Sequence, residues 1–137
     1  MNTIAIGYDG TDVSQRALER GAELAKALGV KLLVISVAPL AAGGVRAGGA
    51  IDSADPPEKH LAELQQAREY LEAQGVTAEY QAAVGDPADT IVELSERGHA
   101  DLVIVGARHH SLIGRLVGQS VSESVSHKAR ADVLIVH

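Results

Sequence analysis

The chain contains no cysteine, phenylalanine or tryptophan among its 137 residues. The absence of cysteine excludes a disulfide framework and a thiolate zinc site, and it mildly favours a reducing compartment. Because only three tyrosines are present, the aromatic surfaces on which single-stranded nucleic acids stack are largely missing. The hydrophobic core is therefore expected to be aliphatic, built from valine, isoleucine, leucine and alanine.

Basic residues are also scarce: 12 lysines and arginines stand against 18 aspartates and glutamates, for a formal net charge of −6. A duplex-binding protein needs a basic face, so the charge argues against a nucleic acid partner. No window approaches the ~18 uncharged apolar residues of a membrane-spanning helix. Residues 1–8 lack the basic start of a signal peptide, and Asp9 interrupts their apolar run. We therefore expect a cytoplasmic protein without a membrane segment, folded as one domain over residues 1–137.

What the sequence does contain is a regular alternation of short apolar runs and segments with helical spacing. The apolar runs predict strands at 3–7, 31–37, 76–84, 102–105 and 132–136. The helical spacing predicts helices at 12–28, 56–75 and 87–98, and a last helix that begins at Leu116 or Ser120 and ends at Ala129. Asp12 and Asp55 are the expected N-caps of the first two helices, because each has Gln or Glu three residues later. The run 76–84 alternates polar and apolar residues, which predicts an edge strand.

Alternating strands and helices predict an α/β fold with a five-stranded parallel sheet and helices on both faces. In such sheets, ligands bind beyond the carboxyl ends of the strands, where the strand order reverses. The order 2-1-3-4-5 would use the loop after the third strand, Gly85-Asp86-Pro87, which is short and suited to capping. The loop after the fourth strand is long and rich in hydrogen-bond donors, and this favours the order 3-2-1-4-5.

The segment 40–55 has no period, and its composition shifts to alanine and glycine with a lone Arg46. We interpret it as a long flexible loop, with a functional lid as the alternative.

Two loops carry the candidate chemistry. The loop after the fourth strand contains Arg108, His109, His110 and Ser111. The first backbone amides of the helix that follows this loop could hold a phosphate. In the alternative interpretation, Ser120 only caps that helix and the His-Arg run is solvated. Asp9, after the first strand, could hold a ribose hydroxyl or a Mg²⁺ ion, or could simply belong to a turn.

Other site classes find little support in the sequence. No Walker A motif and no dinucleotide fingerprint are present. Adjacent His109 and His110 supply at most part of a metal site, and no nucleophile elbow accompanies Ser111. We therefore predict no catalytic residue and no resident metal, although Asp9 could contact a Mg²⁺ bound to a nucleotide.

The two ends of the chain resemble the universal stress protein family. The resemblance rests on residues 4–11 with Ser14, Ala17 and Leu18, and on 102–106, 120–125 and 132–136. It implies the 3-2-1-4-5 sheet, a homodimer through the last strand and ATP as ligand. It places Asp9 near the ribose or a metal, the backbone of Val37 near adenine, and 106–111 and 120–122 near the ribose and phosphates. The predicted nucleotide-binding residues are Gly7, Tyr8, Asp9, Val37, Gly106, Ala107, Arg108, His109, His110, Ser111, Gly118, Gln119, Ser120, Val121 and Ser122.

The chain departs from the family's glycine motif at two positions, where His109 and Gln119 stand in place of glycine. Their side chains either block the phosphates or hold them with charge-assisted bonds. We therefore expect a regulatory stress-response protein that binds ATP with Mg²⁺. A dimeric scaffold that binds partners and no nucleotide is the first alternative, and a slow Mg²⁺-dependent ATPase is the second.

The last predicted strand gives an independent reason to expect a homodimer. Its apolar residues 133–136 (Val133, Leu134, Ile135 and Val136) include no charge that would protect an exposed edge. Pairing with a second copy about a two-fold axis would cover that edge.

Overall fold

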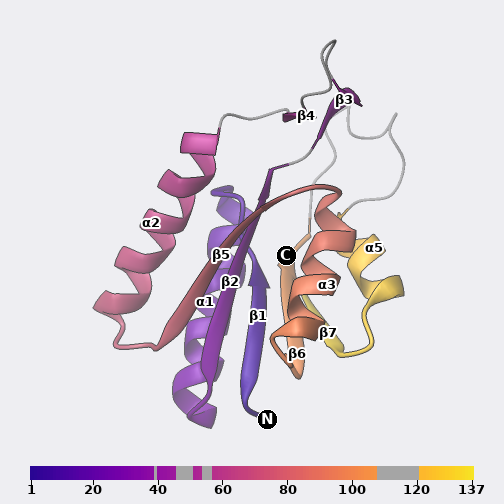
Figure 1. Cartoon of the computed structure of the whole chain (residues 1–137). Helices are drawn as coiled ribbons and strands as arrows, with labels where there is room; N and C mark the ends of the chain where they lie inside the picture. The colour runs from indigo at the N-terminus through magenta and orange to yellow at the C-terminus, as the bar shows by residue number, and fades with distance from the viewer. Residues whose placement is uncertain (39, 46–50, 54–56, 108–120) are drawn as a thin grey trace.

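A computed structural model describes residues 1–38, 40–45, 51–53, 57–107 and 121–137. Seven strands and four helices lie within these ranges (Figure 1). In chain order they are β1 (Thr3–Gly7), α1 (Asp12–Leu28), β2 (Lys31–Ala38), β3 (Leu40–Val45), β4 (Ile51–Ser53), α2 (Pro57–Ala73), β5 (Ala78–Val84), α3 (Pro87–Arg97), β6 (Leu102–Gly106), α5 (Val121–Lys128) and β7 (Asp132–Val136).

The main sheet has five strands in the order β5-β2-β1-β6-β7, and every pair is parallel. Counted without the short β3 and β4, this is the predicted order 3-2-1-4-5, which is confirmed. The order reverses at β1, so the loops after β1 and β6 meet at the carboxyl edge of the sheet. β5 lies at one edge, as its alternating pattern predicted, and β7 lies at the other.

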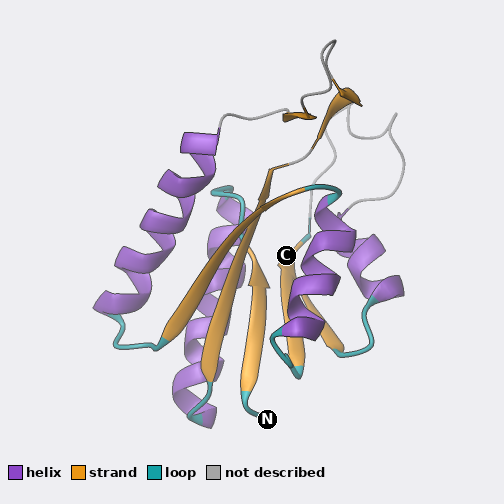
Figure 2. Ribbon diagram, viewed as in Figure 1, coloured by secondary structure: helices purple, strands orange, loops and turns teal. Residues whose placement is uncertain are grey.

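Helices cover both faces of this sheet (Figure 2). On one face, α1 and α2 pack on the strands around Ile4, Ile6 and Val34. On the other face, α3 and α5 pack around Ala5, Ile35 and Val103. Both cores are almost wholly aliphatic, as the composition predicted, with buried Tyr8 as the aromatic exception. Within the described residues, no helix is both long and apolar enough to cross a membrane.

The helix ends agree with the sequence patterns in some places and differ in others. Thr11, not Asp12, is the N-cap of α1, and its side chain accepts a hydrogen bond from the Ser14 amide. The prediction was wrong because either neighbouring oxygen has the right chemistry, and the turn that begins at Asp9 decides which one is used. Asp86 caps α3 as expected and accepts from the Asp89 amide at 2.9 Å. The predicted cap Asp55 lies outside the described residues.

The segment 40–55 contains a second, small sheet, so its interpretation as a loop without strands was wrong, while its flexibility stays a prediction. β3 and β4 pair antiparallel, with Leu40 opposite Ser53 and Val45 opposite Ile51. They lie beyond the carboxyl ends of the main sheet (Figure 1). Backbone groups make such a ladder, so it needs no side-chain period and gives no clear signal in a segment rich in glycine and alanine.

Candidate functional site

A cleft of about 270 Å³ opens at the carboxyl ends of β1, β2 and β6. This is the edge at which the strand order predicted a ligand site. The cleft is lined by residues from both faces of the sheet, namely Gly7, Tyr8, Asp9, Thr11, Val13, Ser14, Ile35, Val37, Lys59, His60, Glu63, Pro87, Ile91, Val105, Gly106 and Val121.

The predicted site residues fall into three groups. Six of them line the cleft: Gly7, Tyr8, Asp9, Val37, Gly106 and Val121. Ala107 and Ser122 are close in sequence but are not among its lining residues, and the Ala107 amide donates to the Val136 carbonyl at 2.7 Å in the sheet. The remaining seven lie outside the described residues: Arg108, His109, His110, Ser111, Gly118, Gln119 and Ser120.

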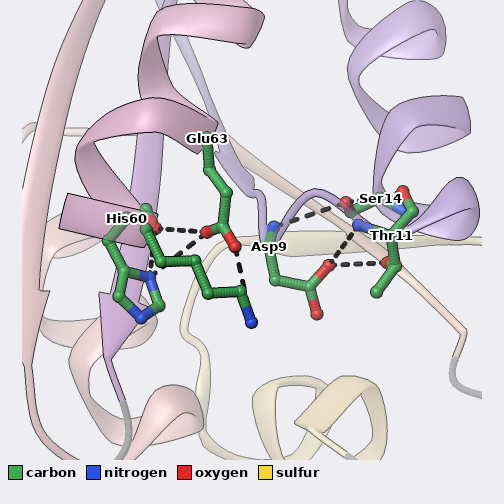
Figure 3. Close-up of polar contacts among 7 residues, drawn as sticks. Asp9, Thr11, Ser14, His60 and Glu63 are labelled. Carbon is green, nitrogen blue, oxygen red and sulfur yellow. Dashed lines mark hydrogen bonds and ion pairs between the residues drawn. The ribbon is translucent and has the colours of Figure 1, made fainter. Parts of the chain in front are cut away.

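The chain leaves β1 through a tight turn built on Asp9. One carboxylate oxygen of Asp9, Oδ1, accepts from the Thr11 hydroxyl at 2.6 Å and from the Thr11 amide at 3.1 Å (Figure 3). The Asp9 amide donates to Ser14 Oγ at 3.3 Å. Gly10 has φ +79°, a conformation that side-chain-bearing residues rarely adopt. Asp9 is therefore a structural turn residue whose carboxylate also borders the cleft and the N-terminus of α1.

Tyr8 contributes to the core more than to the cleft. Its ring is buried among residues of β1, α1 and α2, and its hydroxyl donates to Gln15 Oε1 at 3.3 Å. Burial raises the pKa of Tyr8, and the negative charges of Glu63 and Asp9 raise it further. The Tyr8 amide donates to the Ile35 carbonyl at 2.9 Å, which extends the pairing of β1 and β2 beyond Gly7.

Two glycines line the cleft, Gly7 and Gly106, and a helix approaches each of them closely. A Cβ atom at Gly106 would lie 2.8 Å from the Val13 carbonyl oxygen of α1. A Cβ atom at Gly7 would lie 2.8 Å from Ile91 Cδ1 of α3. Neither glycine is among those with positive φ. Packing against the helices therefore accounts for both glycines.

Val37 directs its backbone groups toward the cleft. The Ile35 carbonyl accepts from β1, while the Ala38 carbonyl accepts from the Gly85 amide on the β5 side. Backbone groups of successive residues in a strand point to opposite neighbours. The N–H and C=O of Val37 therefore point to the β1 side, beyond Gly7, where β1 has ended. Val37 as a whole residue is 9% exposed, and it packs with the core on the α3 side of the sheet.

A buried polar cluster of Ser36, His60 and Glu63 forms the α2 side of the cleft, and the sequence prediction missed it. Ser36 Oγ donates to Glu63 Oε2 at 3.2 Å and lies 3.0 Å from His60 Nδ1. His60 Nδ1 is also 3.2 Å from Glu63 Oε2 (Figure 3). Since the carboxylate oxygen accepts, Nδ1 is assigned as the protonated ring nitrogen. On the other carboxylate oxygen, Oε1, the Lys59 ammonium approaches to 3.9 Å.

His60 and Glu63 are polar residues of α2, yet their side chains are only 6% and 8% exposed. A signal was present: His60 continues the apolar stripe of Leu64, Ala67 and Leu71 at helical spacing. Ser36 likewise interrupts an otherwise apolar strand.

Two neighbouring carboxylates, those of Asp9 and Glu63, line the cleft together with the Lys59 side chain. Burial raises the pKa of Glu63, and the negative charge of Asp9 raises it further, against the opposing effects of His60, the Ser36 hydrogen bond and Lys59. In the part of the chain that the structure describes, no group of three or more His, Cys, Asp or Glu residues could hold a metal ion. The cleft thus combines acceptors at the α2 side with apolar walls from Ile35, Ile91 and Val105.

Comparisons with known proteins agree with this architecture. A family model described as the universal stress protein family matches residues 1–137. The universal stress protein Rv1636 of Mycobacterium tuberculosis is 36% identical, over 98% of this chain and 95% of its own length. The stress response protein NhaX of Bacillus subtilis is 28% identical, over 97% of this chain and 96% of its own. A solved universal stress protein in complex with cAMP aligns with TM-score 0.76 and 33% identity, over 99% of this chain and 96% of that one.

Proposed function

The chain belongs to the universal stress protein family, and we propose that it is a stress-response regulator that binds an adenine nucleotide in the cleft beyond β1, β2 and β6. The observation that carries this proposal is the Val37 backbone, whose N–H and C=O point into a cleft with apolar walls. The related protein solved with cAMP shares 33% of its sequence with this chain, which supports an adenine ligand.

The nucleotide fits the cleft in a defined orientation. Adenine presents a donor beside an acceptor on its Watson–Crick edge, and the N–H and C=O of Val37 complement that pair. Ile35, Ile91 and Val105 supply apolar contacts for the base. The ribose then lies at Asp9, where carboxylate oxygens accept from hydroxyl groups.

The phosphates lie at the opposite end, toward Gly106 and the N-terminus of α5 at Val121. Helix N-termini favour anions through their unpaired amides and partial positive charge. The sequence places Arg108, His109, His110 and Ser111 between these two points, which supports a basic lining for the phosphates. ATP with Mg²⁺ remains our proposed ligand, with AMP and cAMP as the rivals of the same class.

Isothermal titration calorimetry on purified, ligand-free protein tests the proposal with ATP plus Mg²⁺, AMP and cAMP. We expect saturable binding of at least one of the three, weakened about tenfold or more in Asp9→Asn because a charged acceptor is lost. The matched control is Asp12→Asn, since Asp12 is exposed on α1 and does not line the cleft. Absence of binding for all three would overturn the proposal and favour the scaffold interpretation, to which the substitutions His109 and Gln119 point.

We also propose that the protein is a homodimer through β7. Because the Val136 carbonyl faces β6, alternation points the backbone groups of Val133 and Ile135 away from the sheet. A second copy of β7 could pair with this outer edge about a two-fold axis. The half-buried apolar side chains along β7 would gain further cover from such a partner.

A further inference from the structure

We infer that Glu63 is the residue that recognises the sugar of the bound nucleotide, by accepting a hydrogen bond from the ribose 2′-hydroxyl. The inference rests on the proposed nucleotide site and adds a specificity-determining residue to it. It concerns α2, a helix that contributed no residue to the predicted site.

The position of Glu63 carries the argument. Its Cγ would lie 3.1 Å from a Cβ atom at Gly10, so the side chain covers the turn that follows Asp9. Figure 3 shows the Glu63 carboxylate between His60 and Asp9. Glu63 is also bound to Ser36, the residue beside Val37 in β2. The carboxylate therefore lies between the proposed adenine position and the proposed ribose position.

The two oxygens of this carboxylate have different surroundings. Oε2 is 3.2 Å from both Ser36 Oγ and His60 Nδ1. Lys59 Nζ lies 3.9 Å from Oε1, which exceeds a hydrogen-bond distance. Oε1 is therefore the oxygen that can accept from a ligand while Oε2 keeps the side chain in place.

The chemistry of ribose decides which hydroxyl each carboxylate receives. The 2′-hydroxyl is next to the carbon that carries the base, and the 3′-hydroxyl is nearer the 5′-phosphate. Glu63 is anchored beside Val37, whereas Asp9 follows β1, one strand further along the sheet. The 2′-hydroxyl therefore donates to Glu63, and the 3′-hydroxyl donates to Asp9. The 2′-hydroxyl is free in ATP, AMP and cAMP alike, so the assignment to Glu63 holds for each candidate ligand, whereas ATP and AMP alone have the 3′-hydroxyl that donates to Asp9.

A buried Glu63 carboxylate and a half-buried Asp9 carboxylate beside an anionic ligand require such donors. Without a hydroxyl to bind, Asp9 and Glu63 would repel the nucleotide as well as each other. Ser36 and His60 act as positioning residues, because both hold Oε2 and thereby fix the direction of Oε1.

The test compares Glu63→Gln with the wild type by calorimetry, using ATP, AMP and cAMP and the 2′-deoxy form of each. Ser36 and His60 both donate to Oε2, so the single oxygen of the glutamine amide must take that place. The amide nitrogen then occupies the place of Oε1 and presents a donor where the carboxylate presented an acceptor. For the nucleotide that binds the wild type, we expect about tenfold weaker binding in the variant, and less than about twofold change for its 2′-deoxy form.

A second variant, Ser36→Ala, removes an anchor of Oε2 while leaving the acid in place. It should also weaken ribonucleotide binding more than 2′-deoxynucleotide binding, which a general loss of structure would not do. Equal penalties for both sugars in both variants, or no penalty in either, would overturn the role of Glu63 while wild-type binding stands. If the wild type binds none of the six ligands, the nucleotide site itself is overturned and this inference with it.

Discussion

A Cβ atom at Gly106 would lie 2.8 Å from the carbonyl oxygen of Val13 and 2.9 Å from its carbonyl carbon. The last residue of β6 thus touches the backbone of the first turn of α1. A backbone carbonyl within a helix cannot move aside as a side chain can. This contact joins the ends of the two strands that border the cleft, because α1 follows the Asp9 turn after β1 and Gly106 is the last residue of β6.

We predict that Gly106→Ala destabilises the protein by about 1–3 kcal/mol, the usual range for overpacking. Urea unfolding followed by circular dichroism measures the loss. The matched control is Gly7→Ala, where the added methyl meets the terminal Cδ1 of Ile91, a flexible side-chain end, also at 2.8 Å. The Gly7 variant should lose less than the Gly106 variant, and the reverse ranking would contradict the packing argument.

The fold was predictable because it depends on patterns that extend over many residues. The alternation of apolar runs and helical stripes predicted the parallel sheet, and the short Gly85-Asp86-Pro87 loop separated the two possible strand orders. Features that depend on which of two neighbouring side chains makes a hydrogen bond were harder to predict. Thr11 and Asp12 both have capping side chains, and the bond between Thr11 and Asp9 decides between them.

Only the part of the candidate site that lies at the carboxyl ends of the strands was predictable from the sequence. Asp9, Val37 and Gly106 lie at or just beyond the carboxyl ends of strands at the switch point, so topology alone brings them together. His60 and Glu63 lie on a helix that passes over the end of β2, and their burial depends on how that helix packs. A histidine within an apolar stripe and a serine within an apolar strand were the available signals, and neither reveals its partner without the tertiary structure.

The N-cap of α1 gives a second prediction. Thr11→Val keeps the shape of the side chain but removes the hydroxyl that accepts from the Ser14 amide and donates to Asp9. We expect a loss of about 1 kcal/mol in the free energy of unfolding, the typical value for an N-cap. Asp12→Ala, which removes the residue predicted from sequence, should cost less in the same urea titration. A larger loss in the Asp12 variant would restore Asp12 as the cap.

Glu63 gives a prediction about pH. Its pKa is raised above the ordinary value of 4.5 in the folded protein, so the folded state binds the proton more tightly than the unfolded state. This contribution to stability is fully present below the ordinary pKa and is lost as pH rises through the folded pKa. The free energy of unfolding of the wild type, relative to Glu63→Gln, should therefore fall as the pH rises above 4.5 and through the folded pKa. A difference that is flat or rises over this window would contradict the raised pKa.

Asp101 gives the opposite dependence. The backbone amides of Asn2 and Thr3 donate to its Oδ2 at 2.7 and 3.2 Å and lower its pKa below 3.8. Stabilisation from this group is present above the ordinary pKa and is lost as pH falls through the folded value. Asp101→Ala should therefore melt below the wild type at pH 7, and the gap should narrow as the pH falls below 3.8. Asp101→Asn keeps an acceptor oxygen and should show a smaller gap at pH 7.

The proposed homodimer can be tested at the backbone of β7. Ile135→Pro removes an N–H that points to the outer edge, so it should break pairing with a second copy while the ladder to β6 remains. Leu134→Pro is the matched control, because the Leu134 N–H points to β6 and its loss damages the sheet itself. Light scattering at micromolar concentration should report a dimer for the wild type and a monomer for Ile135→Pro. Circular dichroism should report a folded Ile135 variant and a destabilised Leu134 variant. A wild-type monomer, or a dimeric Ile135→Pro, would show that β7 does not form the interface, since a proline cannot donate the hydrogen bond that continued pairing requires.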